Sequence, residues 1–203
     1  MGSDDGELIG RQSGSAGRIV SGRGRARSPA LPGAPSRGAR QISISDAAWR
    51  LLAVRSRSRE ELRRRLLRKG LDGAAVDHEL ARLQEQGYID DDAFARAWVA
   101  VRQGGSVPRG AAMLTAELLR KGVDREVTRD AVAAGDDSTA AGIAARKRAT
   151  ALAARPYGEF RRRLFAFLQR RGFGYDVSRL AVDQAWQDLT GASAPPTDEA
   201  EPK

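Results

Sequence analysis

The sequence predicts an all-α protein organised as an elongated array of similar helical units. The first observation is a repeated segment: Leu66–Asp72 reads Leu-Leu-Arg-Lys-Gly-Leu-Asp, and Leu118–Asp124 differs from it only by valine for leucine. A third, diverged copy reads Leu-Gln-Arg-Arg-Gly-Phe-Gly over Leu168–Gly174, so the segment returns about every fifty residues, a period typical of repeat architectures. The second observation is that apolar residues recur at helical spacing and never alternate with period two. Because one short unit cannot bury its own apolar face, neighbouring units should stack into a curved, elongated array.

The breakers between the helical patterns predict where each unit begins and ends. Gly, Ser and Pro cluster at Gly104–Pro108, before the second copy of the segment, and Pro156 precedes the third. The predicted segments are a disordered basic N-terminal extension (1–41), repeat 1 (42–104), repeat 2 (105–154), repeat 3 (155–190) and a disordered tail (191–203).

The composition bounds the class of protein and of partner. The chain has 203 residues, no cysteine and a formal net charge of +9, so disulfides and thiolate metal sites are excluded and a polyanionic or acidic partner is favoured. No apolar run is long enough to cross a membrane, and the N-terminus carries Asp4, Asp5 and Glu7 where a signal peptide needs basic residues. A soluble cytoplasmic protein is expected.

The N-terminal 41 residues consist mainly of Gly, Ser, Pro and Arg and hold too few apolar residues to offset the entropy of folding. Two interpretations stay open. The segment is either a basic arm that tethers nucleic acid or an extension with no role of its own. Its arginines are Arg11, Arg18, Arg23, Arg25, Arg27, Arg37 and Arg40.

Two helices open the ordered part of the chain. The first should be capped by Ser43 or Ser45 and run to Arg55. The second should begin at a capping box, in which Ser58 accepts from the amide of Glu61 and the Glu61 side chain reaches back.

The second helix should end at Gly70, because glycine adopts the left-handed C′ conformation most readily. Its apolar face is formed by Leu62, Leu66 and Leu67. The charged residues should pair on its surface: Glu60 with Arg64, Glu61 with Arg65, and Arg63 with a carboxylate or extended along the apolar surface.

Aspartates should cap most of the later helices. Asp72 precedes a helix with Val76, Leu80 and Leu83 on one face, and Asp124 begins the equivalent helix of the second unit. Between them, Tyr88 and Ile89 should enter the core before an aspartate caps a helix with Phe94, Trp98 and Val101 at i, i+4 and i+7. An alanine-rich helix should run to Ala154, and Asp176 or Ser178 should start the last helix.

The succession of these segments resembles the RecX family, bacterial regulators of the RecA recombinase. The resemblance runs from Ala47 to Trp186 in the family's order and spacing. It is carried by Arg57-Ser58 with Glu61-Leu62, Leu66 to Leu71, Gly87 to Asp91 with Phe94-Ala95 and Trp98, Pro108-Arg109-Gly110, Glu117-Leu118 and Lys121-Gly122-Val123. The resemblance implies three tandem three-helix repeats and a protein that binds RecA filaments on single-stranded DNA. It also implies inhibition of ATP hydrolysis, strand exchange and coprotease activity. The residue patterns themselves predict no cofactor, no metal and no catalysis by the chain.

Arginine and lysine side chains in all three units are the candidate binding surface for the filament or its DNA. On a helical wheel, Arg64, Arg65 and Arg68 share one arc opposite Leu62 and Leu66. The alternative is a solvated face that only confers solubility, but its return in each unit without balancing acids favours binding. The candidates are Arg64, Arg65, Arg68, Lys69, Arg109, Arg120, Lys121, Arg161, Arg162, Arg170 and Arg171.

Other residue types give weaker signals. Trp49, Trp98 and Trp186 have the chemistry to stack on bases, but their helical spacing favours core packing. The run Asp90–Asp92 is better explained by helix capping than by a cation site, and His78, the only histidine, should be exposed. No nucleotide-binding or triad pattern is present, so an enzyme is not predicted.

Two rival functions stay open at this point. One is a helical-repeat protein that binds nucleic acid generally and needs no protein partner. The other is a structural adaptor, whose activity would not depend on the basic face. For the regulator, the sequence predicts a monomer that contacts the RecA filament and single-stranded DNA within or near it, and no membrane.

Overall fold

A computed structural model describes residues 43–191; the predicted N-terminal extension and all but the first residue of the predicted tail lie outside this range. The described part contains α-helices and one short 3-10 helix but no strand, which confirms the all-α class. The helices are α1 (Ile44–Val54), α2 (Arg59–Leu67), α3 (Gly73–Glu85), α4 (Asp91–Gln103), α5 (Ala111–Arg120), α6 (Arg125–Ala133), α7 (Asp137–Ala149), η1 (Thr150–Leu152), α8 (Tyr157–Arg170) and α9 (Tyr175–Thr190).

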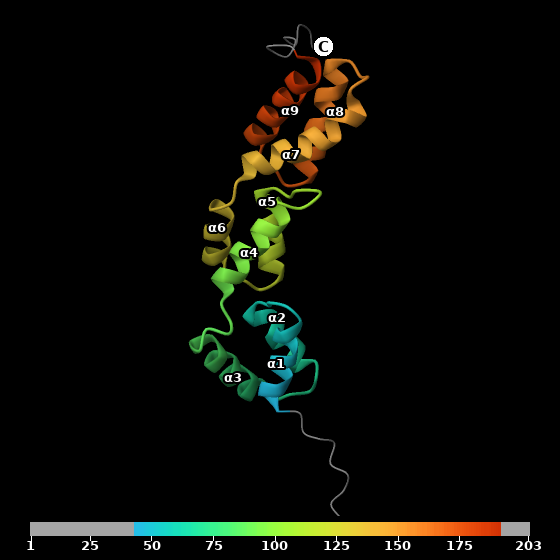
Figure 1. Cartoon of the computed structure of the whole chain (residues 1–203). Coiled ribbons are helices and arrows are strands. Elements are labelled where there is room, and N and C mark those ends of the chain that lie inside the picture. The colour runs from blue at the N-terminus through green and yellow to red at the C-terminus, as the bar shows by residue number, and fades with distance from the viewer. Residues whose placement is uncertain (1–42, 192–203) are drawn as a thin grey trace, which may run out of the picture. The chain divides into compact units, whose positions relative to one another are not determined.

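The helices form three modules, each with its own hydrophobic core (Figure 1). Leu62, Leu66 and Leu80 are fully buried in the core of α1–α3, and Leu114 and Leu118 in that of α4–α6. The third core joins Phe160, Leu164 and Leu168 of α8 to a series of alanines on α7 and to α9. These cores identify the repeating unit as a three-helix module.

The boundaries of these modules differ from the predicted repeats. Repeat 1 was predicted to extend to residue 104, but Phe94, Ala95 and Val99 of α4 pack in the core of α5 and α6. Repeat 2 was predicted to extend to residue 154, but Ala141 and Ala145 of α7 pack in the core of α8 and α9. After the turns that precede them, α4 and α7 bury their apolar faces in the core of the following module instead of the previous one.

The repeated segment ends the middle helix of every module in the same way. Gly70, Gly122 and Gly172 have φ angles of 77°, 77° and 85°, the left-handed conformation predicted for a helix stop. The position after the glycine turns inward: Val123 and Phe173 are buried, and Leu71 packs against the first core.

Side-chain caps fix the starts of several helices. Ser58 accepts from the amide of Glu61, Asp72 from Ala75 and Asp90 from Ala93, as the sequence predicts. Further aspartates, Asp124 and Asp136, cap α6 and α7.

The start predicted for the last helix at Asp176 or Ser178 is wrong, because α9 begins at Tyr175 after Gly174. Ser178 lies inside the helix and is fully buried. Its hydroxyl oxygen accepts a hydrogen bond of 3.1 Å from the side-chain amide of Gln169.

Three apolar residues predicted to pack in the core are exposed: Trp49, of which 40% stays exposed, Val101 and Tyr88. Val101 is 72% exposed because the buried face of α4 passes through Phe94, Ala95 and Val99, two residues before Val101. Tyr88 is 54% exposed because Ile89, buried in the first core, takes the inward position after the Gly87 turn. Tyr88 and Trp49 instead line an exposed groove on the first module.

Consecutive modules join through the ends of their middle helices. The Ser58 hydroxyl at the start of α2 donates to the carbonyl oxygen of Lys121 at the end of α5, over 2.6 Å. In the same way, the backbone N–H of Gly110 at the start of α5 donates to the carbonyl oxygen of Arg171 at the end of α8, over 2.9 Å. At each junction, the acceptor is a carbonyl oxygen at the end of a middle helix. The donor lies at the start of the middle helix of the module before it.

Candidate anion-binding site

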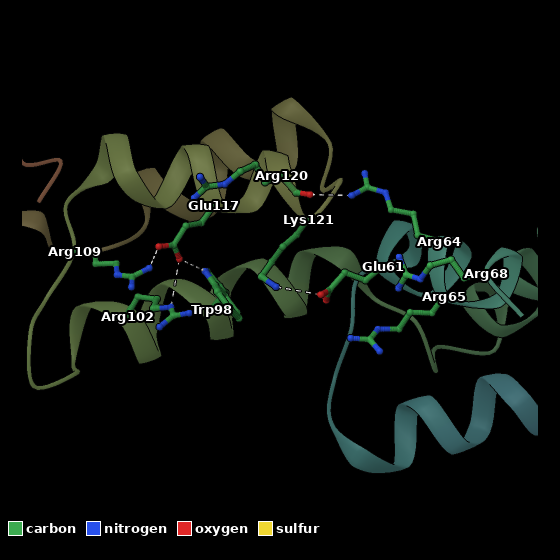
Figure 2. Close-up of a pocket in the computed structure, with 10 residues that line it drawn as sticks. All are labelled: Glu61, Arg64, Arg65, Arg68, Trp98, Arg102, Arg109, Glu117, Arg120 and Lys121. Atoms are coloured by element: carbon green, nitrogen blue, oxygen red, sulfur yellow. Dashed lines mark hydrogen bonds and ion pairs between the residues drawn. The ribbon is translucent and has the colours of Figure 1, made fainter.

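A basic pocket lies where the first two modules meet, with a volume of about 470 Å³. Three arginines of α2 and its C-terminal end reach the pocket: Arg64, Arg65 and Arg68. They lie within about one helical turn of each other, on the face opposite the buried leucines. Figure 2 shows these side chains facing Arg120 and Lys121 at the end of α5. The full lining is seven cations and two carboxylates: Arg64, Arg65, Arg68, Arg102, Arg109, Arg120, Lys121, Glu61 and Glu117, together with Trp98.

Glu117 organises the part of the pocket on the second module (Figure 2). Its side chain is only 7% exposed and forms ion pairs with Arg109 and with Arg102, whose Nε lies 3.3 Å from Oε2. The indole nitrogen of Trp98 donates a third interaction, 2.9 Å from Oε2. Burial, followed by the charges of neighbouring arginines, lowers the pKa of Arg109, although a guanidinium stays protonated. One buried carboxylate therefore holds two cations at the pocket wall.

Glu61 links the two modules. Its Oε1 lies 2.9 Å from Nη2 of Arg55 and 3.2 Å from Nζ of Lys121. Burial alone would raise the pKa of Glu61, but the hydrogen bonds and charges of Arg55 and Lys121 outweigh it and lower the pKa to about 2. The predicted pair with Arg65 and the predicted return of Glu61 to the Ser58 amide are replaced by these contacts, which no helical spacing could reveal.

Three guanidinium groups of the pocket remain available to a ligand. Within residues 43–191, Arg65, Arg68 and Arg120 form no ion pair, whereas Arg64 is 2.7 Å from Glu60 and donates to the carbonyl oxygen of Arg120 over 3.0 Å. Arginine forks bind phosphate and carboxylate oxygens in pairs. The pocket therefore has the chemistry of a polyanion site.

Trp98 takes part in the pocket as a support for cations. The guanidinium carbon of Arg102 lies 4.3 Å from the ring centroid and Nζ of Lys121 lies 4.1 Å from it, distances typical of cation–π contacts. Its rings also stack near Phe94, at a centroid separation of 6.0 Å. These neighbours occupy the tryptophan, so the pocket suits phosphate or carboxylate groups better than stacked bases.

Comparison with known proteins places the chain in a family. A family model described as "RecX, first three-helix domain" matches residues 46–83, which cover most of α1–α3. The chain is 34% identical over 143 residues to the regulatory protein RecX of Chlorobaculum tepidum, a match that spans 70% of this chain and 88% of that protein. The chain belongs to the RecX family. It is also 35% identical over 164 residues to the regulatory protein RecX of Amycolatopsis mediterranei, covering 79% and 93% of the two chains.

The fold agrees with that of a solved RecX structure. The crystal structure of RecX from Lactobacillus salivarius superposes with a TM-score of 0.64 at 21% identity, covering 73% of this chain and 97% of that one. The RecX resemblance and the helical-repeat arrangement predicted from the sequence are thus confirmed.

The pocket brings together about half of the binding residues predicted for this RecX-family chain. Arg64, Arg65, Arg68, Arg109, Arg120 and Lys121 line it. Lys69 is exposed beside it at the end of α2 but is not part of its lining.

The predicted residues of the third module lie elsewhere. Arg162 and Arg170 are exposed on α8, and Arg161 is half-buried there. The guanidinium of Arg171 donates to the carbonyl oxygens of Val107 and Pro108 and so supports the junction of the second and third modules. Their binding role stays a prediction.

The sequence did not point to Arg102 or to the two carboxylates of the basic pocket. Arg102 is on α4, which was assigned to the wrong side of the module boundary, so no spacing connected it with α5. Glu117 lies three residues after Leu114 and directly before Leu118, and a charged residue on this leucine face was the available signal. A buried charge at such a position indicates an ion-pair network.

The other candidate sites have structural explanations. Asp90 caps α4, and the Asp91 carboxylate accepts from the backbone N–H of Arg59, 2.8 Å away; burial raises the pKa of Asp91. His78 is exposed, as predicted. Over residues 43–191 there is no cluster of His, Asp or Glu able to hold a metal, and no helix in this range has the length and apolarity to cross a membrane.

Proposed function

We propose that the chain is a regulator that binds filaments of the RecA recombinase on single-stranded DNA and restrains their ATP hydrolysis, strand exchange and coprotease activity. The regulator acts by shape and charge, without a cofactor and without catalysis of its own, and so contributes to the control of DNA repair and recombination. It works as a monomer in the cytoplasm. Membership of the RecX family, whose relatives are named regulatory proteins, supports this assignment.

The observation that carries the proposal is the basic pocket at the first module junction. Its seven cations come from α2, α4, α5 and the loop before α5, and Glu117 and Glu61 hold Arg109 and Lys121 in place before any ligand arrives. Cations held in position bind an anion with a smaller entropy loss. Phosphates of the DNA or acidic side chains of the recombinase are the anions available along such a filament.

Restraint of the filament follows from binding to more than one subunit. A filament subunit must change conformation during each cycle of ATP hydrolysis. A ligand that prefers one conformation shifts the population toward it by its difference in affinity. A repeat protein that contacts several subunits at once opposes the change in all of them.

A titration of the recombinase with this chain tests the proposal. The wild-type chain should slow DNA-dependent ATP hydrolysis by purified RecA at substoichiometric amounts. The variant Arg64→Glu/Arg65→Glu/Arg68→Glu should require at least about tenfold more protein for the same inhibition, since it loses several charge-assisted contacts of about 1 kcal/mol each.

A charge-matched variant provides the control. Arg125→Glu/Arg146→Glu/Arg148→Glu reverses three exposed arginines outside the basic pocket, so it changes the net charge equally. It should inhibit almost as well as the wild type. Unchanged ATPase rates with the wild-type chain would overturn the proposal. Equal loss of inhibition in both triple variants would show that net charge, and not the pocket, causes the inhibition.

A second candidate is a protein that binds single-stranded DNA directly and needs no recombinase. The unpaired guanidinium groups of Arg65, Arg68 and Arg120 favour it, because they suit phosphates of any nucleic acid. Binding to bare single-stranded DNA and to the preformed filament at about 50 and 200 mM salt separates the two. A clear preference for the filament supports the regulator, and equal, strongly salt-dependent binding supports the second candidate.

A further inference from the structure

An aromatic groove on the first module is a second candidate site, separate from the basic pocket. It has a volume of about 510 Å³ and shares no lining residue with that pocket. Its walls are Trp49 and Tyr88, whose rings meet edge to face with centroids 4.5 Å apart. The two side chains stay 40% and 54% exposed, and Leu52 and Ala53 of α1 also line the groove. Large aromatic side chains left exposed together are typical of interaction surfaces.

A buried arginine lines the same groove. Arg57 is 7% exposed, and its Nε donates to the carbonyl oxygen of Leu51 over 3.0 Å. Its Nη1 is excluded from solvent and has no hydrogen-bond partner among residues 43–191. A buried N–H without an acceptor is costly, so this guanidinium has unused capacity for an anion.

No carboxylate of the surrounding elements supplies that acceptor. Glu61 is held by Arg55 and Lys121, and Asp90, on the rim, accepts from the amide of Ala93 as the cap of α4. Burial, and then the charges of Arg55 and Arg65, lower the pKa of Arg57. Within residues 43–191, Arg57 thus forms no ion pair, and an incoming negative group can supply the missing partner.

We propose that this groove binds an acidic peptide segment of a partner protein in which a carboxylate lies next to a large apolar side chain. The carboxylate pairs with the guanidinium of Arg57, and the apolar side chain packs against the paired rings of Trp49 and Tyr88 and against Leu52. Charge complementarity and the apolar walls together select this occupant. A phosphodiester chain fits less well, because Arg57 is the only cation among the residues that line the groove, whereas such a chain carries a charge at every nucleotide.

The groove is a site of its own and goes beyond the proposed function. It can be tested with a peptide, without recombinase or DNA. The probe is a fluorescein-labelled peptide, Gly-Ser-Asp-Phe-Asp-Gly-Ser, titrated with the full chain and followed by fluorescence anisotropy. Saturable binding is expected. Replacing both aspartates by asparagine should weaken it about tenfold, and replacing phenylalanine by alanine should weaken it about fivefold.

Variants of the chain locate the binding. Trp49→Ala and Tyr88→Ala remove exposed rings and should each weaken binding at least about fivefold, as expected for aromatic anchors. Tyr175→Ala, which removes an equally exposed ring that meets Phe165 outside the groove, is the matched control and should leave binding unchanged. Arg57→Lys keeps a positive charge but loses the fork geometry, and circular dichroism checks its fold.

Three results would overturn the proposal. One is the absence of saturable binding by the acidic peptide at millimolar concentration. Another is equal binding of the peptide with asparagines, and the last is an equal effect of Tyr88→Ala and Tyr175→Ala. Displacement of the peptide by a short oligothymidylate from the wild-type chain would assign the groove to nucleic acid instead.

Discussion

The hydroxyl of Ser58 donates a 2.6 Å hydrogen bond to the carbonyl oxygen of Lys121, and this contact repeats in kind between Gly110 and Arg171. In both cases the acceptor is the residue directly before the left-handed glycine of the repeated segment. The segment therefore stops its own helix and also provides the docking point for the neighbouring module. The same residues, Lys121 and Arg171, direct their side chains toward the previous module, to Glu61 and to Pro108.

The close approach of Gly110 and Gly172 should make glycine at position 110 essential for stability. A Cβ atom built on Gly110 would overlap the carbonyl group of Gly172 and the amide of Phe173. Because both neighbours are backbone, Gly110→Ala should lower the free energy of unfolding by about 3 kcal/mol, the upper range for overpacking. Urea unfolding followed by circular dichroism measures the change.

Two other glycines calibrate this result. Gly70→Ala meets no neighbour and should cost only about 1 kcal/mol for its left-handed backbone. Gly158→Ala, inside α8 with open space around it, should be neutral or slightly stabilising. Equal effects at positions 110 and 70 would argue against close contact between the second and third modules.

Glu117→Gln should destabilise the second module strongly. The substitution keeps the size of the side chain but removes the charge that holds Arg102 and Arg109 together. Loss of one partner of a buried ion-pair network costs about 3 kcal/mol. Thermal or urea unfolding measures it, with the exposed Glu126→Gln as the control that should change stability by less than about 0.5 kcal/mol.

Glu61 should make the junction of the first two modules sensitive to acid. Its pKa falls from 4.5 to about 2 on folding, so its stabilising contribution is complete above about pH 5 and is lost as the pH falls from 4.5 toward 2. After allowance for partial exposure, the loss amounts to about 2 kcal/mol. Between about pH 6 and pH 3, the wild type should lose somewhat more than half of this amount, about 1 kcal/mol, relative to Glu61→Gln. Identical pH dependence in the two proteins would contradict the role of the pair with Lys121.

The unpaired arginines of the basic pocket should determine the salt dependence of polyanion binding. Arg65→Ala and Arg68→Ala should each reduce the slope of log K against log salt by about one unit, as expected for loss of one phosphate contact. Fluorescence anisotropy with the recombinase filament between about 50 and 200 mM salt measures the slope. Arg125→Ala, outside the pocket, should leave it unchanged, and a drop equal to that of Arg65→Ala would point to non-specific charge.

Local sequence accounts for most of the secondary structure. Ser58, Asp72 and Asp90 cap helices where predicted, and Gly70 and Gly122 end them, because caps and stops depend on a few neighbouring residues. The errors occur where two residues compete for one inward position. Tyr88 and Val101 are apolar enough for a core, but Ile89 and Val99 occupy the buried positions instead.

The sequence by itself determined the helices, their stops, the repeat and the membership of the RecX family. Only the tertiary structure decided that α4 and α7 belong to the following module, that Glu61 pairs with Lys121 rather than Arg65, and that Arg57 lacks an acceptor. The reason is physical: helix propensity, capping and periodicity act over a few residues. The basic pocket instead joins side chains some sixty residues apart, and the aromatic groove joins Trp49 of α1 to Tyr88, so both depend on how the cores pack.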